Sequence, residues 1–424
     1  MRSALAATST LLFGILVLML GAGLHVTLLG VRATAEGFST FATGILLACY
    51  YAGMAVGSVA APRLVRRVGH IRVFAGLTSI ASATVLLHSL FVNPWAWGAL
   101  RSVSGFGFAG VYVVAESWLN HQADNRTRGA LLGVYMVVLY TGQGLGQFLL
   151  NAADPRGSVL FIVVSVLIST AVVPMTFTAQ RMPELASPRR AGLRDLLDAS
   201  PLGVVGVCAS GAASGTAFSL AAVYAATQGF AVSRIAEFVA LGIFAAVLIQ
   251  LPLGRLSDRM DRRNVLAVMS SVAAVAALAA WLLAERSTPL LFFAAATCAG
   301  LSFSTYSIAA AHVNDHLTPA QMVAASGTLL LVNAGGAVAA PIVVSAAMQW
   351  TTNEAYFAAL AAMHLAFAGY TLWRKRRRAP VPAAEKAPFV AQPRTPQMAP
   401  LAADLAAAAG GSNAGASGLD GGPR

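Results

Sequence analysis

The amino-acid sequence predicts an all-α membrane protein with twelve transmembrane helices in two six-helix bundles. Of its 424 residues, 57% are hydrophobic and only 10% are charged. Soluble proteins average about 25% charged residues, so this chain lacks the charge to cover a water-exposed surface of its size. Its apolar residues come in long runs, whereas a transmembrane β-barrel would show alternating segments of about ten residues. The arrangement of these runs gives the division into two bundles.

Twelve apolar runs are long enough to cross a bilayer as helices, for which about 20 mostly apolar residues are needed. The first six lie near 9–30, 41–61, 72–92, 95–118, 129–150 and 158–179. The last six lie near 202–227, 233–253, 264–284, 288–311, 321–346 and 355–373. Most separators are short and carry turn residues, as in the pair Asn93-Pro94.

The longest internal separator divides the chain into two halves, because it contains Pro183, Pro188 and Pro201. We therefore expect an N-terminal bundle, an interdomain linker, a C-terminal bundle and a tail that is first basic and then disordered. Their boundaries are 1–180, 181–201, 202–374 and 375–424. The tail from 379 onward is rich in Ala, Pro and Gly and cannot bury enough apolar surface to fold.

The Lys and Arg residues predict the orientation of these runs. With an even number of spans, 23 of the 28 Lys and Arg fall on the side of both termini and only 4 on the other. Both termini are therefore expected in the cytoplasm, with the protein in the inner (plasma) membrane. The first run resembles a signal peptide, but its removal would leave eleven spans, so we expect it to be retained.

The net charge of +12 is then mainly a topology signal. The basic residues form short clusters between apolar runs rather than one surface patch, which argues against a nucleic-acid partner. Attraction to anionic lipid at residues 374–378 is a secondary possibility.

A shift of 194 residues aligns the two halves. It pairs Tyr112 with Tyr306, Gly133 with Gly327 and Gly142 with Gly336. The matches fall in the fourth-to-fifth and tenth-to-eleventh runs, which are equivalent places. Two parallel repeats of six spans are typical of transporters with a substrate site near the middle of the bilayer.

Residues 254–263, which read GRLSDRMDRR, resemble the G-x-x-x-D-R-x-G-R-R signature of the major facilitator superfamily, with Asp261 in place of the last Gly. This resemblance implies a cytoplasmic gate that latches the two halves. The first-half copy is weaker, because Arg66 occupies the acidic position. The alternative is that these arginines only enforce topology. The gate residues would be Arg66, Arg67, Gly69, Asp258, Arg259, Arg262 and Arg263.

Arg101 is the one cation well inside a predicted span, where a charge is costly unless it faces a cavity or a partner. With Gly105 it resembles the R-x-x-Q-G-x-G pattern of the superfamily's fourth span, with Ser104 replacing Gln. The resemblance implies that Arg101 assists proton coupling or binds an anionic group. Pairing with backbone carbonyls is the structural alternative.

Glu116 lies toward the cytoplasmic end of the same run. The stretch Ala115–Asn120 resembles the YcaD-type subfamily of the superfamily. Glu116 could exchange protons, or it could anchor a gate ion pair with Arg66, Arg67 or Arg128; we favour the gate. His25 is a further candidate for proton coupling, with ordinary hydrogen bonding as the alternative.

The fifth run resembles the G-x8-G-P-x-x-G pattern of superfamily antiporters, although Gln143 replaces the Pro. The glycines expected to allow close helix packing are Gly105, Gly133, Gly142, Gly146, Gly327 and Gly336. Polar or aromatic residues within the spans are candidates for lining a cavity: Tyr112, Gln143, Gln147, Gln250, Tyr306 and Asn333.

The sequence therefore predicts a proton-coupled secondary transporter of a small organic solute, with export by antiport favoured over uptake by symport. A membrane sensor or scaffold without transport is the alternative from another class. No P-loop, serine-hydrolase motif or cysteine pair is present, so we expect no enzyme activity, metal or cofactor. Membrane lipid is the expected surrounding, and we expect a monomer.

Overall fold

The computed structural model describes residues 2–122, 128–176 and 191–377, and every regular element in them is a helix. The first half contains α1 (Arg2–Ala35), α2 (Thr40–Val68), α3 (His70–Leu90), α4 (Pro94–Gln122), α5 (Arg128–Phe148), the 3-10 turn η1 (Leu149–Ala152), α6 (Val159–Thr170) and α7 (Val173–Thr176). The second half contains α8 (Leu193–Ala199), α9 (Pro201–Thr227), α10 (Val232–Arg259), α11 (Arg262–Leu283), α12 (Thr288–Asn314), α13 (Pro319–Trp350) and α14 (Ala355–Lys375).

The helices match the twelve predicted runs. Ten of those in the described residues are long and apolar enough to cross a membrane, and α5 and α6 occupy the two remaining runs. The predicted run 158–179 is interrupted, since α6 ends at Thr170 and α7 begins at Val173. Pro174 accounts for the break, because proline has no N–H to donate to the carbonyl of Thr170, four residues earlier, where α6 ends.

The predicted linker and tail lie partly or wholly outside the described residues. Within 191–201, the short helix α8 packs on α9 with Leu196 buried. The Ala191 N–H donates to the Ala324 carbonyl at 3.0 Å, and the Thr328 hydroxyl donates to the Ala191 carbonyl at 2.7 Å. The end of the linker is thus part of the second half. The predicted disordered segment 379–424 is among the residues that are not described.

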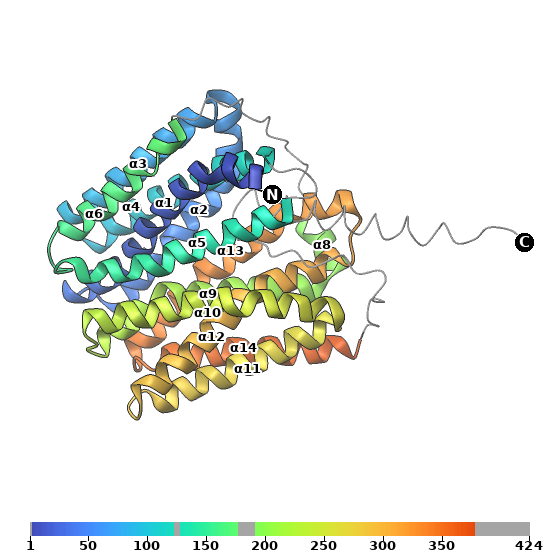
Figure 1. Ribbon diagram of the computed structural model, residues 1–424. Helices are drawn as coiled ribbons and strands as arrows, with labels where there is room; N and C mark the ends of the chain where they lie inside the picture. Colours follow the sequence, from blue (N-terminus) through green and yellow to red (C-terminus); the bar gives the residue numbers. More distant parts are fainter. Residues whose placement is uncertain (1, 123–127, 177–190, 378–424) are drawn as a thin grey trace, which may run out of the picture.

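The two halves repeat the same pattern of helix contacts and lie side by side (Figure 1). In the first half, α2 packs on α4, α3 on α4 and α6, and α1 on α5 and α6. In the second half, α10 packs on α12, α11 on α12 and α14, and α9 on α13 and α14. The internal repeat seen in the sequence therefore corresponds to a repeated six-helix unit.

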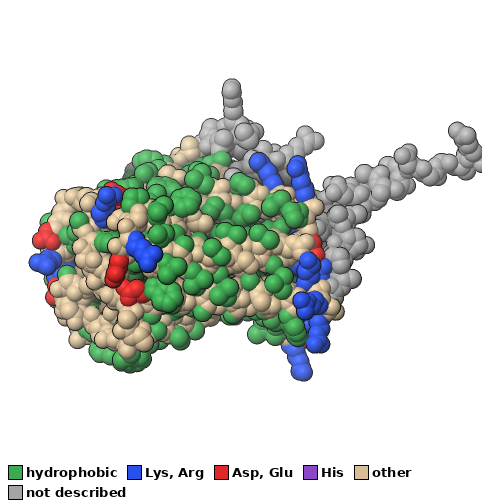
Figure 2. Space-filling model, turned by 90° about the horizontal axis from the view of Figure 1, so that it is seen from below, with side chains coloured by type: hydrophobic (Ala, Val, Ile, Leu, Met, Phe, Trp, Pro, Cys, Tyr) green, Lys and Arg blue, Asp and Glu red, His purple; other side chains and the backbone are tan. Residues whose placement is uncertain are grey.

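The two ends of the bundle differ in charge, as Figure 2 shows. One end, here called the arginine-rich end, carries the arginines at the end of α2, at the junction of α10 and α11, and at the end of α14. The opposite end has acidic and basic residues together, as in the ion pairs Arg32–Glu36 and Arg234–Glu237. Between the ends lies a wide band of exposed apolar side chains, which is the surface that lipid would cover.

Glycines bring particular helices close together. A Cβ atom at Gly53 of α2 would overlap the backbone of Ser102 in α4, and one at Gly105 of α4 would overlap the backbone of Tyr50. A Cβ atom at Gly142 would lie 2.6 Å from Met19 Cβ, so α5 approaches α1 in the same way. Small residues allow such contacts, which are the usual basis of helix association in membranes.

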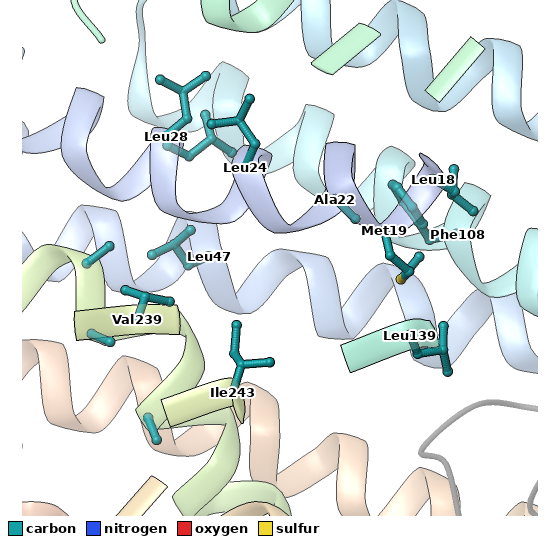
Figure 3. Close-up of a cluster of buried hydrophobic side chains, with 14 of the residues drawn as sticks. Leu18, Met19, Ala22, Leu24, Leu28, Leu47, Phe108, Leu139, Val239 and Ile243 are labelled. Atoms are coloured by element: carbon teal, nitrogen blue, oxygen red, sulfur yellow. The ribbon is translucent and has the colours of Figure 1, made fainter. Parts of the chain in front are cut away.

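The halves pack against each other toward the opposite end, through α1 on α9, α2 on α13 and α5 on α10. The Thr40 N–H donates to Gln349 Oε1 at 2.7 Å, and a Cβ at Gly44 would overlap Ser345. Figure 3 shows part of a buried apolar cluster to which Leu47 of the first half and Val239 and Ile243 of the second half all belong.

The arginine-rich end is packed differently. There the described buried apolar residues of α8, α9, α11, α12, α13 and α14 form a separate cluster with no member from the first half. In the described residues, the contacts between the two halves therefore gather toward the opposite end. Between them lies a cavity.

Candidate functional site

The cavity between the halves is the candidate site. It encloses about 1210 Å³ of space, including the part that opens to solvent. Helices α1, α2, α4 and α5 line it from the first half, and α9, α12 and α13 from the second. A cavity at the interface of two repeats is the usual place for a small organic molecule to bind.

Arg101 lies on the first-half wall and is only 2% exposed. The close approach of α2 to α4 at Gly53 and Gly105 brings the Tyr50 ring over its guanidinium, with 4.3 Å between Cζ and the ring centroid. A cation over an aromatic face is attracted by about 2 kcal/mol when both groups are away from water. No described carboxylate forms an ion pair with Arg101.

His25 of α1 is the neighbour of Arg101, and its Nδ1 atom lies 3.4 Å from Arg101 Nη1. Because a guanidinium nitrogen can only donate, Nδ1 must accept and the imidazole must be neutral, with its hydrogen on Nε2. Proton binding at Nδ1 would break this contact and place two positive charges side by side. The predicted coupling candidates Arg101 and His25 therefore lie together on the cavity wall.

His88 of α3 lies behind this pair, which the sequence did not indicate. Its ring meets the His25 ring edge to face at 5.2 Å between centroids. His88 Nδ1 lies 2.5 Å from the Thr84 carbonyl, and the Trp97 indole donates to the His88 carbonyl at 3.0 Å. Two histidines 63 residues apart give no pattern by themselves, so only the packing of α1 on the rest of the half reveals the pair.

The rest of the cavity wall is aromatic and apolar, with a few amide and hydroxyl groups. Tyr140 and Phe303 meet across the halves with 6.3 Å between ring centroids, and Phe218 packs edge to face on Phe303. Asn333 lines the second-half wall and donates to the Val207 carbonyl at 3.1 Å. No described lining residue is acidic, and Arg101 is the one charged residue among them.

Three of the six predicted lining residues line this cavity: Tyr112, Gln143 and Asn333. Gln147 is buried elsewhere, because its side chain bonds with Thr27 of α1 and the Gln143 carbonyl. Gln250 donates to the Ser307 hydroxyl at 3.2 Å and so joins α10 to α12. Tyr306 is buried in the apolar cluster of the second half. The structure thus places these last three residues outside the lining of this cavity.

Glu116 is buried at the contact of α4 with α5 and is not part of the cavity wall. The Tyr135 hydroxyl donates to Glu116 Oε1 at 2.9 Å. The carboxylate therefore ties two helices of the first half together. Of the gate partners expected for it, Arg66 and Arg67 are exposed at the end of α2, and the side chain of Arg128 is not described.

The second-half signature forms a compact cluster at the arginine-rich end. Arg262 is buried and pairs with Asp315 at 2.6 Å and Asp258 at 3.2 Å, and it also donates to the Ala311 carbonyl. These contacts join α10, α11 and α12 within one half. Asp258 thus forms an ion pair with Arg262 of its own half, and a latch between the two halves stays a prediction.

Asp261 stands where the family has Gly, and it begins α11. Its carboxylate accepts from the backbone and the side chain of Arg263, the latter at 2.7 Å. Burial alone would raise the pKa of Asp261, but the hydrogen bonds and charge of Arg263 outweigh it and hold the pKa below its usual value. Asp261 is thus an N-cap that is paired with its own helix.

The first-half copy contains Gly69 at the turn from α2 to α3. Its φ of 96° is a backbone conformation that favours glycine, which explains the residue at this turn. Among the other predicted packing glycines, Gly146 faces α1 and Gly336 faces α9. A Cβ at Gly133 would meet nothing within 4 Å, so Gly133 permits no close contact. Gly327 lies within α13.

A repeated six-helix unit with a cavity between its two copies defines the protein as a membrane transporter. The family model of the Major Facilitator Superfamily matches residues 11–341 and 202–417. The chain belongs to the major facilitator superfamily, as its sequence motifs predicted.

Relatives and solved structures agree with this assignment. Proteins of Escherichia fergusonii and Escherichia coli named as the MFS-type transporter YcaD are 29% identical over 355 residues, which cover 83% of this chain and 92% of theirs. The structure of the nucleoside transporter NupG superposes with a TM-score of 0.69 at 14% identity, covering 87% of this chain and 98% of NupG. A bacterial homologue of the lysosomal transporter Spinster, in an inward-facing and unoccupied conformation, gives a TM-score of 0.65 at 15% identity, covering 96% and 98%.

Proposed function

We propose that the protein moves a small organic solute across the bacterial inner membrane by alternating access, driven by protons, and that it works as an exporter. The Arg101–His25 contact on the cavity wall carries this proposal. A proton on His25 would displace Arg101. Protonation of His25 would therefore change the part of the cavity wall that contacts the solute. The direction rests on the antiporter-like glycine pattern of α5, in which Gly142 faces α1.

The orientation that we propose puts the arginine-rich end in the cytoplasm, following the excess of Lys and Arg at that end. The halves are joined at the opposite end, so the described conformation would be the one open to the cytoplasm. Both termini would then be cytoplasmic. We also propose that the protein works as a monomer, since the cavity lies within one chain.

Uptake by proton symport is the second candidate, and the same contact favours it. If a solute draws Arg101 away from His25, then Nδ1 becomes free to bind a proton. Solute and proton would then bind together rather than in competition.

Proteoliposomes with an imposed pH gradient test the proposal. With acid outside, antiport expels a preloaded solute, whereas symport draws in an external one; a dye records internal pH and a solute panel identifies the cargo. We expect Arg101→Ala to abolish gradient-driven flux while the protein still inserts. Arg156→Ala is the matched control, because Arg156 is exposed and is not among the residues that line the cavity. Flux that survives Arg101→Ala, or that ignores the pH gradient, would contradict the proposed coupling.

A further inference from the structure

The positive charge of Arg101 on the cavity wall has no negative charge beside it among the described lining residues. Arg101 is the one charged lining residue in the described part of the chain, and it makes no ion pair there. A cation at this depth costs several kcal/mol or more unless water or a partner compensates it. The cation–π contact with Tyr50 offsets only part of that cost. The wall of the cavity therefore presents a positive group without a counter-charge among the described lining residues.

The hydrogen bonds of Arg101 are also incomplete. Its Nε atom is buried without a partner, and its contact with His25 is long at 3.4 Å. His25 Nε2, which carries the hydrogen of the neutral ring, is likewise buried without a partner. Guanidinium groups are donors only, so what this wall lacks is an acceptor. A carboxylate or sulfonate supplies several acceptor oxygens together with a negative charge.

The remaining walls suit an apolar body. Phe108, Tyr140, Phe218 and Phe303 line the cavity, together with aliphatic side chains such as Leu330. Aromatic rings that meet edge to face, as Tyr140 and Phe303 do, leave ring faces and edges for a further ring. Cationic solutes would be repelled by Arg101, and neutral solutes would leave its charge uncompensated.

We infer that the solute of this transporter is an aromatic organic anion, whose carboxylate or sulfonate binds Arg101 and whose rings lie against the aromatic wall. This inference rests on the proposed transport function and adds the chemical class of the transported solute. It does not depend on the direction of transport. The anion would provide the acceptor and the counter-charge that the described lining residues do not supply.

Binding of three probes of one shape to the purified full-length protein in detergent tests this inference. The probes are 2-naphthoate, 2-naphthamide and 2-naphthylmethylamine, measured by calorimetric titration at neutral pH. We expect naphthoate to bind at least about tenfold more tightly than the other two, which corresponds to about 1.4 kcal/mol. In Arg101→Gln, naphthoate should fall to the affinity of naphthamide, and Arg156→Ala should behave as the wild type.

Two outcomes would overturn the substrate class. One is naphthamide or the amine binding as tightly as naphthoate, and the other is no binding by any of the three. A naphthoate preference that persists in Arg101→Gln would remove Arg101 from the site. If Arg101→Gln does not fold, Tyr50→Leu tests the same wall, because loss of the ring over Arg101 should reduce the preference for the anion. None of these outcomes depends on a pH gradient, so proton-driven flux of another solute would leave the transport proposal standing.

Discussion

The Glu116 carboxylate and the Tyr135 hydroxyl form a buried hydrogen bond between α4 and α5. Replacing Tyr135 by Phe would remove the donor and leave the carboxylate with fewer partners. Hydrogen bonds to charged groups contribute about 1.5–3 kcal/mol, so we expect Tyr135→Phe to destabilise the protein by about that amount.

Thermal unfolding of the purified variant in detergent measures this effect. Tyr370→Phe is the matched control, because no described hydrogen bond involves the Tyr370 hydroxyl, and its unfolding temperature should stay unchanged. An unaltered unfolding temperature for Tyr135→Phe would show that Glu116 does not depend on this bond.

The sequence predicts which polar residues lie within the membrane spans better than it predicts which side of the helix each of them faces. Gln143 and Gln147 are one helical turn apart and share a side of α5, yet only Gln143 reaches the cavity. Gln147 instead meets Thr27, because α1 crosses α5 at that level. Arg101 was found because a lone charge within an apolar run stands out. His88 was not connected to His25, because nothing in a sequence measures the distance between two spans.

The contact of α2 with α4 depends on glycine. A side chain at Gly53 would push the two helices apart and move Tyr50 away from Arg101. Overpacking of a tight contact costs about 1–3 kcal/mol, so we expect Gly53→Val to lower the unfolding temperature and to weaken solute binding.

The matched control is Gly76→Ala in α3. A Cβ at Gly76 would meet nothing within 4 Å. Alanine is the better helix former by up to about 1 kcal/mol, so this variant should be as stable as the wild type or slightly more stable. Equal behaviour of the two variants would mean that α2 and α4 tolerate a wider spacing.

The start of α11 should depend on pH through Asp261. Because Arg263 lowers the pKa of this carboxyl in the folded protein, its ionised form stabilises the fold above the carboxyl's ordinary pKa. That stability is lost as the pH falls through the lowered native pKa. We expect the unfolding temperature of Asp261→Asn to be lower than that of the wild type at neutral pH, and the gap to close in acid. A gap that is constant with pH would assign the effect to capping alone.

The limits of the helices were largely predictable, since apolar runs and turn residues set them. The departures have local causes. Pro174 divides the sixth span, and α8 forms where Leu196 can be buried against α9. The amphipathic signal of seven residues is too short to separate such a helix from a linker by sequence alone.

The contact between the halves at the opposite end should control the state of the whole molecule. A Cβ atom added at Gly44 would overlap the side chain of Ser345 and would lie 3.1 Å from the carbonyl oxygen of Pro341. A large side chain there would separate the halves at this end. If each half moves as a unit, Gly44→Phe should bring the halves together at the arginine-rich end.

Distances between spin labels at Val68 and Leu256 report this change, because both are exposed near the arginine-rich end. The distance should shorten in Gly44→Phe, in a background without the native cysteines. Gly335→Phe on α13 is the control, since a Cβ at Gly335 would meet nothing within 4 Å, and it should leave the distance unchanged. An identical distance in both variants would mean that the halves do not rock about the cavity.

At the scale of the whole chain, the sequence predicted the two repeats and the charge difference between the ends. It did not predict which end is closed. That depends on which contacts between halves are stronger at a given moment, and a transporter sequence must encode both arrangements. The contacts of Gly44 and of its neighbours describe one of them.

The second-half arginine cluster has a mechanical consequence. Arg262 of α11 pairs with Asp258 of α10 and with Asp315 at the end of α12. One guanidinium therefore holds the ends of three helices together, and we expect these three ends to move as one body during the transport cycle.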